Sequence, residues 1–371
     1  MSKEQALLRP YTLGPIELKN SVVMAPMTRS RADNPASAPT EMHVEYYTQR
    51  AGAGLIITEG SQVSKRAVGY IHTAGIHNEK QIAGWKKVVN AVHERGGKIF
   101  IQLWHVGRMS HPDFHNGDKP LAPSAVNPNA KSFTPEGFKD TMEPKAMTLD
   151  EIKETQQEFV QAAKNAKEAG FDGIEIHASN GYLFHQFFNT KSNLRTDNYG
   201  GSKENRARFL FEILDKTKEI WPENRIGIRL NPSLNGTFGI EATPETIPTF
   251  DYIIKKLNDY NLAYLHLSEP FTDVSEIDFL VSDIAKHYRP IYKGTLMINN
   301  GFDRETGNAI IESGNADLVA YAKLFISNPD LAERFKINAP LADWDDDTFY
   351  TQGKAGYTDY PSYNEHVDEN A

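Results

Sequence analysis

Residues 21–29 read Ser-Val-Val-Met-Ala-Pro-Met-Thr-Arg. The first seven form a short apolar run, which is typical of a parallel strand buried on both faces. A doubly wound open sheet usually continues from its first strand into a glycine-rich dinucleotide-binding turn. Here the corresponding turn is Ala25-Pro26-Met27-Thr28-Arg29, which contains no glycine. The stretch therefore favours a closed barrel over an open sheet.

Seven further runs of this kind follow along the chain, each rich in Ile, Val or Leu. The eight predicted strands cover residues 21–27, 55–59, 98–104, 173–177, 226–230, 264–268, 295–299 and 318–321. Amphipathic helical patterns lie between them. Eight strand–helix units predict an α/β fold of the (β/α)8 TIM-barrel type. Because such barrels commonly occupy a long chain as one unit, we expect residues 1–371 to form a single domain.

Several helix starts and irregular segments can be placed on this pattern. Capping boxes are predicted at Thr148/Glu151 and Asn78/Gln81, and capped first-turn prolines at Thr243-Pro244 and Asn328-Pro329. Residues 11–20 predict a hairpin that closes the barrel floor. The segments 105–147 and 178–202 are long loops after the third and fourth strands, where barrels carry their active sites. The tail over about 340–371 is first acidic and then aromatic.

The composition excludes several classes of protein. Lys and Arg number 40 against 49 Asp and Glu, a net charge of −9, which argues against a general nucleic-acid binder. Cysteine is absent, so thiolate-held clusters and cysteine nucleophiles are excluded. The start, Met1-Ser2-Lys3-Glu4-Gln5, lacks the apolar core of a signal peptide, and no run of about 18 apolar residues predicts a membrane span. We expect a soluble, cytoplasmic protein.

Polar residues follow almost every predicted strand at its carboxyl end. They are Thr28, Glu59-Gly60, Gln102, Trp104, His105, His177, Asn180, Tyr182, Arg229, Ser268-Glu269, Asn300-Gly301 and Ala322-Lys323. Each buried polar group needs a partner, so such groups rarely gather to build a core. Together they predict a polar pocket at the barrel mouth.

Two kinds of chemistry compete for this pocket. Glu59, Glu175 and Glu269 allow a glycosidase-like pair of carboxylates, although pairing of each with a barrel Arg or Lys is the more economical interpretation. His105, His111 and His115 are irregularly spaced, so we predict no metal site there.

The stretch His177-Ala-Ser-Asn180-Gly-Tyr182 indicates a different reaction. His and Asn three residues apart can both direct N–H donors at one oxygen and form an electrophilic clamp. Tyr182 carries a phenol suited to giving a proton at neutral pH. A capping histidine and a packed tyrosine are the structural alternative.

Seven stretches, in barrel order, carry a family resemblance. They are Met24-Ala-Pro-Met-Thr-Arg-Ser-Arg31, Thr58-Glu-Gly-Ser61, Ile101-Gln-Leu-Trp-His-Val-Gly-Arg108, Asp172-Gly-Ile-Glu-Ile-His-Ala-Ser-Asn-Gly-Tyr-Leu183, Arg195-Thr-Asp-Asn-Tyr-Gly-Gly201, Ser327-Asn-Pro-Asp-Leu331 and Asp359-Tyr-Pro361. With these the chain resembles the Old Yellow Enzyme family of flavin-dependent ene-reductases. The resemblance implies a non-covalently held FMN across the barrel mouth, which supplies the redox chemistry that a cysteine-free chain lacks.

The resemblance also implies roles for individual residues. Thr28 is expected to bond the flavin C4 carbonyl, Gln102 the pyrimidine edge, and Arg229 to lie near N1–C2, where a cation favours the reduced anion. The remaining expected FMN contacts are Pro26, Met27, Gly60, Asn300, Gly301, Ala322, Lys323 and Phe349. The family usually has Gly-Arg where this chain has Ala322-Lys323, so a point charge replaces a two-pronged donor and FMN is expected to bind more weakly.

The implied reaction has two halves. NADPH, or NADH, reduces FMN, and an alkene activated by a carbonyl or nitro group then accepts hydride at its β carbon. His177 and Asn180 clamp the activating oxygen and Tyr182 protonates the α carbon, while phenols bind as inhibitory ligands. Tyr70, Trp104 and Tyr350 are expected pocket aromatics, and the loops 105–147 and 271–280 are expected to set substrate scope. The alternatives are a barrel hydrolase using paired Glu residues and a flavoprotein with a redox-binding role and no dedicated alkene substrate. The protein is expected to be a monomer or homodimer.

Overall fold

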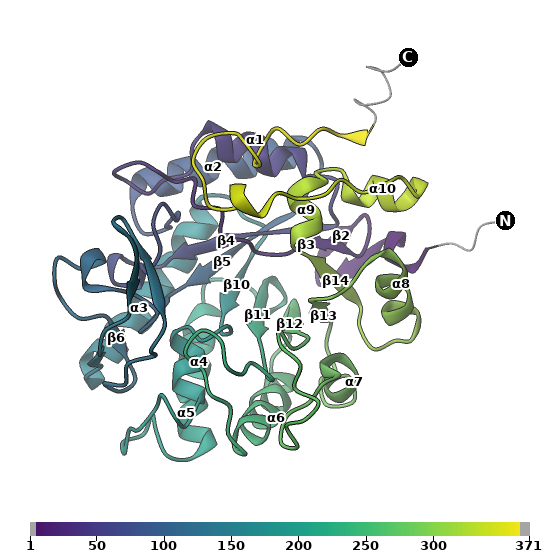
Figure 1. The fold of residues 1–371 in the computed structure, drawn as a ribbon. Coiled ribbons are helices and arrows are strands. Elements are labelled where there is room, and N and C mark those ends of the chain that lie inside the picture. The colour runs from purple at the N-terminus through teal and green to yellow at the C-terminus, as the bar shows by residue number, and fades with distance from the viewer. Residues whose placement is uncertain (1–4, 364–371) are drawn as a thin grey trace.

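The computed structural model describes residues 5–363 and contains a closed barrel of eight parallel strands (Figure 1). The start of the chain at 1–4 and the end of the tail at 364–371 lie outside the described residues. The barrel strands are β3 (Val22–Met24), β4 (Leu55–Gln62), β5 (Ile99–Trp104), β10 (Gly173–His177), β11 (Ile226–Leu230), β12 (Tyr264–Ser268), β13 (Leu296–Asn299) and β14 (Leu318–Tyr321). Each pairs with the next along the chain, and β14 returns to β3, which confirms the predicted (β/α)8 barrel.

Every residue of these eight strands is buried, which explains why their sequences read as continuous apolar runs. The predicted hairpin forms from β1 (Tyr11–Leu13) and β2 (Ile16–Leu18), paired antiparallel. Its apolar residues cluster with inward-facing side chains such as Phe100 and Met297. The hairpin therefore closes one end of the barrel.

Helices surround the barrel and follow the predicted order. They are α1 (Glu41–Gln49), α2 (Glu79–Glu94), α3 (Leu149–Glu168), α4 (Leu183–Phe188), α5 (Lys203–Thr217), α6 (Thr246–Lys256), α7 (Ile284–Tyr288), α8 (Arg304–Glu312), α9 (Lys323–Ser327) and α10 (Leu331–Ile337). No helix within residues 5–363 is both long and apolar enough to span a membrane.

Two of the four predicted helix starts are confirmed and two are displaced. Reciprocal capping boxes begin α2 at Asn78 and α3 at Thr148. In contrast, α6 and α10 are preceded by Glu245 and Asp330, two residues beyond Thr243 and Asn328. A turn intervenes in each case, because Thr246 N donates to Thr243 O (2.8 Å) and Leu331 N to Asn328 O (3.1 Å).

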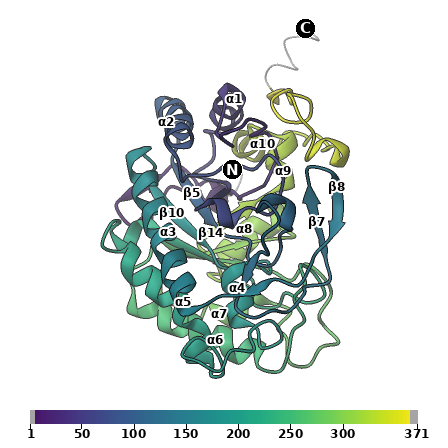
Figure 2. The same cartoon turned by 90° about the vertical axis from the view of Figure 1, so that its left-hand side faces the viewer.

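The two long loops at the barrel mouth contain more structure than the sequence predicted. Segment 105–147 holds two small sheets, β6 (Leu121–Ala122) with β9 (Lys145–Ala146), and the hairpin β7 (Lys131–Thr134) with β8 (Gly137–Asp140). Segment 178–202 contains α4, whose residues are all buried. Figure 2 shows the β7–β8 hairpin at the edge of the barrel, below the yellow C-terminal segment.

Candidate functional site

A cavity of about 390 Å³ lies at the carboxyl ends of the barrel strands. Its volume is in the range of small-molecule sites. It is lined by Pro26, Met27, Thr28, Arg29, Ser30, Gly60, Tyr70, Gln102, Trp104, Phe133, Phe138, His177, Asn180, Tyr182, Arg229, Phe238, Ala322, Lys323, Ile326, Phe349 and Tyr350. The structure therefore brings together every residue expected to contact FMN or substrate except Asn300 and Gly301. Four other polar residues predicted at the barrel mouth do not line the cavity: Glu59, His105, Ser268 and Glu269.

Asn300 and Gly301 follow β13 but do not line this cavity. The Asn300 side chain is turned to the neighbouring loop, where its Nδ2 donates to Glu269 O (3.1 Å) and Pro270 O (2.8 Å). Its backbone adopts a left-handed conformation, with φ of 78°. The amide is therefore used to hold the loop after β12.

His177 and Asn180 lie together on the wall of the cavity, as the clamp requires. His177 is the last residue of β10, and its Nδ1 is 3.0 Å from Ser179 Oγ. A hydroxyl hydrogen donated from Ser179 leaves the ring hydrogen on Nε2. Burial, with Arg229 nearby, lowers the pKa of His177 well below its ordinary value. The ring is therefore neutral at physiological pH, and the clamp does not titrate there.

Asn180 is oriented by its backbone and by a neighbouring amide. It occupies the left-handed region, with φ of 54°, which Asn tolerates better than most residues. Its Oδ1 accepts from Asn231 Nδ2 at 3.1 Å. This contact fixes the amide, whose own Nδ2 remains a hydrogen-bond donor for a ligand.

Tyr182 stands among aromatic rings at the same wall. Its ring centroid lies 5.0 Å from that of Trp104 and 5.0 Å from that of His177, and its hydroxyl donates to Tyr70 Oη at 3.3 Å. Burial, reinforced by Tyr70, raises the pKa of Tyr182 well above its ordinary value. The phenol therefore keeps its proton at neutral pH, as a general acid must.

Arg229 supplies a buried cation beside the clamp. It is the register partner of His177 on the neighbouring strand β11, and its Nε has no hydrogen-bond partner within the described residues. A buried guanidinium N–H without a partner, on a residue that lines the cavity, indicates a site for an electron-rich ligand atom. Behind it, Glu175 accepts from Gln102 Nε2 at 2.7 Å and lies 2.9 Å from His266 Nδ1. Burial opposes ionisation of Glu175, but His266 and Arg229 outweigh it and lower the pKa.

The part of the wall beside Tyr182 is shaped by close packing around Gly60. A β carbon at this position would lie 2.7 Å from the Trp104 ring, so only glycine fits between β4 and β5 here. The Trp104 ring also stacks on Tyr70, with centroids 5.5 Å apart and planes at 15°, and lies 6.1 Å from the His177 ring. The glycine therefore allows an aromatic cluster to form directly beside His177 and Tyr182.

Six cavity residues were missed by the sequence analysis: Arg29, Ser30, Phe133, Phe138, Phe238 and Ile326. Phe133 and Phe138 pair across the β7–β8 hairpin, with stacked rings 4.6 Å apart. They fall within segment 105–147, which the sequence analysis expected to set substrate scope without naming individual residues. Phe238 lies between two glycines in the loop after β11, a turn signal that could have drawn attention to it.

The loop 271–280 was expected to help set substrate scope, but none of its residues lines the cavity. Phe271 and Phe279 in this loop are exposed, each at 38%. The wall that the loop was expected to supply comes instead from Phe238 and from the β7–β8 hairpin.

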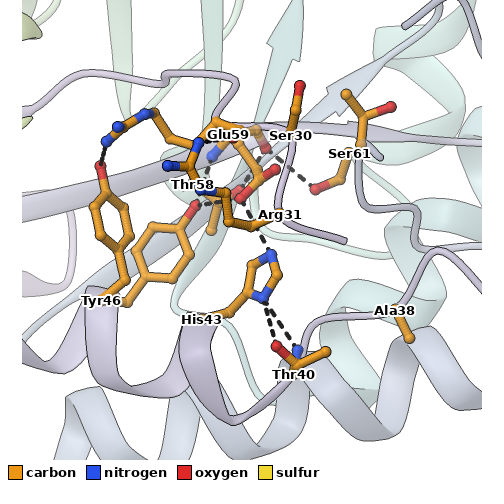
Figure 3. A network of polar contacts seen from close by, with 12 residues as sticks. Ser30, Arg31, Ala38, Thr40, His43, Tyr46, Thr58, Glu59 and Ser61 are labelled. Atoms are coloured by element: carbon orange, nitrogen blue, oxygen red, sulfur yellow. Dashed lines mark hydrogen bonds and ion pairs between the residues drawn. The ribbon is translucent and has the colours of Figure 1, made fainter. Parts of the chain in front are cut away.

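The carboxylates considered for a hydrolase face away from the cavity. Figure 3 shows Glu59 directed toward Arg31 and His43, in a buried network behind the site. Its Oε1 accepts from Tyr47 Oη (3.2 Å) and lies 3.8 Å from His43 Nε2. Burial raises the pKa of Glu59 to about 7.

Glu269 also does not line the cavity, and its carboxylate instead stabilises the start of a helix. Its carboxylate accepts from the backbone N–H groups of Ile284 (2.8 Å) and Ala285 (3.0 Å) at the start of α7. The expected pairing with Arg or Lys is met only at longer range: Arg31 lies near enough to offset part of the rise in the pKa of Glu59, and Arg229 near enough to help lower that of Glu175, but the direct contacts come from His, Tyr, Gln and backbone groups. The cavity lining contains no Glu or Asp among the described residues, so this structure offers no pair for a glycosidase.

The three histidines considered as possible metal ligands each contact a different neighbouring group. His105 Nδ1 accepts from Gly107 N, His111 Nδ1 faces Asp113, and His115 Nε2 contacts Ser110 Oγ at 2.9 Å. Over the described part of the chain, no group of three potential ligands gathers around a common point.

The C-terminal segment reaches the cavity because two buried arginines hold it. Arg31 donates to the carbonyls of Phe349 (2.8 Å), Thr348 (2.8 Å) and Ala355 (3.1 Å). Arg29 donates to Phe349 O at 3.1 Å and to Gly356 O at 2.7 Å. These contacts place Phe349 and Tyr350 at the cavity, although Phe349 is 320 residues from Arg29 in the sequence.

Comparison with known proteins agrees with this geometry. Residues 6–342 match the family model described as the NADH:flavin oxidoreductase / NADH oxidase family. The chain is 41% identical over 368 residues to 12-oxophytodienoate reductase 1 of Oryza sativa subsp. japonica, covering 98% of this chain and 94% of that protein.

Solved structures give the same result. Morphinone reductase in complex with tetrahydroNAD superposes with a TM-score of 0.90 at 44% identity, covering 97% of this chain and 99% of that one. The Old Yellow Enzyme homologue from Zymomonas mobilis superposes with a TM-score of 0.90 at 38% identity, covering 96% and 99%.

Proposed function

This chain belongs to the NADH:flavin oxidoreductase / NADH oxidase family of Old Yellow Enzyme-type oxidoreductases, and from that premise we propose that it reduces alkenes activated by a carbonyl or nitro group. The observation that carries the proposal is the convergence of His177, Asn180, Tyr182 and Arg229 on one cavity. We propose a single FMN-binding domain in which the tail and segment 105–147 complete the mouth of the barrel.

The residues at the cavity fit an FMN. Arg229, whose Nε is unpartnered, would offer a cationic donor to the N1–C2 edge, and Gln102, fixed by Glu175, would contact the pyrimidine ring. Thr28 would bond the C4 carbonyl, while Pro26, Met27 and Gly60 offer backbone contacts along the ring. Ala322, Lys323 and Phe349 also line the cavity, and we assign them to the phosphate end and the outer edge of the ring. When bound, FMN supplies hydride transfer from a reduced nicotinamide to the alkene.

The clamp polarises the substrate. His177 and Asn180 each present an N–H donor, and we propose that both bond the oxygen of the activating group. Two donors that strengthen as negative charge develops on this oxygen lower the barrier for attack at the β carbon. Because His177 is neutral, the clamp acts through hydrogen bonds and does not transfer its proton.

Tyr182 completes the reaction by protonating the α carbon. Its raised pKa keeps the phenol protonated, and Tyr70, within hydrogen-bond distance, fixes its direction. The same clamp would hold a phenol through its oxygen, so phenols are proposed as inhibitory ligands. We propose NADPH or NADH as reductant, a cytoplasmic location, and a monomer or homodimer.

The decisive experiment compares two electron acceptors. Oxidation of NADPH, and separately of NADH, is followed anaerobically with cyclohexenone and aerobically without it. An ene-reductase consumes the nicotinamide in proportion to the cyclohexanone formed. Oxidation with oxygen alone, and no reduction of cyclohexenone, would instead support a flavoprotein without a dedicated alkene substrate.

A further inference from the structure

Among the described residues that line the cavity, Lys323 is the only lysine, and the structure gives it a competing partner. Its Nζ lies 3.3 Å from Asp346 Oδ1 in the C-terminal segment. The same ammonium group lies 5.3 Å from the ring centroid of Trp344 and 5.5 Å from that of Phe349. Lys323 is therefore surrounded by one carboxylate and two aromatic faces that all come from residues 344–349.

The surroundings of Asp346 are strongly acidic. Residues 343–347 read Asp-Trp-Asp-Asp-Asp, and the structure places them beside the cavity through Lys323 and Phe349. Asp345 is occupied in capping the short helical turn at Asp346–Thr348, since its side chain accepts from Asp347 N. Asp346 is the acidic side chain that reaches the lysine.

A phosphate at Lys323 would meet this carboxylate. An ammonium group is a point charge without the fixed fork of arginine, so it cannot present separate, pre-oriented donors to two anions. Asp346 and a phosphate on the same ammonium group would also repel one another. We infer that Asp346 competes with the phosphate group of FMN for Lys323 and so weakens retention of the cofactor. This inference rests on the proposed function, because it assumes that FMN occupies the cavity.

The expected size of the change in FMN affinity follows from the solvent exposure of the two side chains. The side chains of Lys323 and Asp346 are 54% and 67% exposed, so solvent screens the pair. Exposed ion pairs contribute little, and the expected effect of removing Asp346 is therefore about a two- to fivefold gain in FMN affinity at low salt.

The test uses full-length protein stripped of flavin and titrated with FMN or riboflavin, with binding followed by quenching of flavin fluorescence. Release of FMN from the holoprotein on dilution provides a second measurement that needs no stripping. Asp346→Asn should bind FMN about two- to fivefold more tightly and riboflavin unchanged, because riboflavin has no phosphate. Asp347→Asn, a neighbouring exposed carboxylate, is the matched control and should leave both affinities unchanged.

A double-mutant cycle isolates the lysine. In a Lys323→Ala background, Asp346→Asn should tighten FMN less than it does in the unmutated protein, because only the direct repulsion between Asp346 and the phosphate remains. Equal tightening in the two backgrounds would overturn competition for the lysine. An unchanged or weakened FMN affinity for Asp346→Asn, or equal tightening of FMN and riboflavin, would overturn the competition while leaving the proposed function intact. Failure of the unmutated protein to bind either flavin would overturn both.

Discussion

His177 and Asn180 provide the first test at the scale of single residues. The variant His177→Ala/Asn180→Ala removes both donors of the clamp, and loss of one such donor typically costs about 10²–10³ in kcat. We expect reduction of cyclohexenone to fall at least that far while the yellow colour of bound flavin remains, because Arg229 and Gln102 are unchanged. Absorption spectra test whether the flavin stays bound, and steady-state rates test whether reduction of cyclohexenone is lost. Undiminished turnover would remove the clamp from the mechanism.

Tyr182 makes a separate prediction. Tyr182→Phe keeps the ring in its contacts with Trp104 and His177 but removes the acidic proton. We expect oxidation of the reduced flavin by an alkene to slow by about 10²–10⁴, the usual contribution of a general acid. Reduction of the flavin by NADPH should change little. Rapid-mixing absorbance measurements separate the two half-reactions, and a larger effect on flavin reduction would contradict the assignment.

At the scale of elements, Arg31 joins the C-terminal segment to the barrel. Its buried guanidinium group donates to the carbonyls of Thr348, Phe349 and Ala355. Hydrogen bonds from charged groups contribute roughly 1.5–3 kcal/mol each, so Arg31→Ala should lower the free energy of unfolding by about 3 kcal/mol. Because Phe349 and Tyr350 lose one of the two arginines that hold their segment, KM for alkenes should rise severalfold.

Urea unfolding and steady-state kinetics measure the two effects of Arg31→Ala. Arg95→Ala, at an exposed arginine after α2, is the control for loss of a surface charge. Arg31→Lys should recover only part of the stability, since one ammonium group cannot reach all three carbonyls. A destabilised Arg31→Ala variant with unchanged KM would show that the anchor does not position the cavity residues.

The elements also explain what the sequence could and could not predict. The eight strands were recognisable because burial on both faces leaves continuous apolar runs, and the polar residue after each strand then marked the mouth. The β7–β8 hairpin and α4 were not predicted, since short elements in mouth loops lack a clear period. Phe238 was missed although Gly236 and Gly239 mark a turn around it. The contacts between the two arginines and the tail could not be predicted from the sequence, because they join residues about 320 positions apart.

At the scale of the whole molecule, buried histidines make the fold sensitive to acid. Burial lowers the pKa of His43 to about 4 and those of His105 and His185 to about 3, and it lowers that of His177 well below its ordinary value. Each group is neutral when folded but takes up a proton near pH 6.5 when unfolded. The unfolded state therefore binds more protons below pH 6.5, and stability falls as pH decreases from about 6.5 toward 4.

Two carboxyl groups act in the opposite direction, because burial raises the pKa of Glu59 to about 7 and also raises that of Glu269. A raised carboxyl pKa favours the folded state as pH falls, for Glu59 from about 7 to 4.5. The four histidines outweigh these two groups, and each contributes a slope of up to about 1.4 kcal/mol per pH unit. The urea midpoint should therefore be clearly lower at pH 5 than at pH 7. An equal or higher midpoint at pH 5 would contradict the burial of these rings in their neutral form.

The account depends on FMN lying in the cavity beside Arg229, and one measurement tests this most directly. The purified protein is examined by visible absorption, then denatured, and the flavin released into solution is identified and counted per chain. We predict the absorption band of an oxidised flavin and about one molecule of released FMN per chain. A colourless protein that does not regain this band when titrated with FMN would contradict the account.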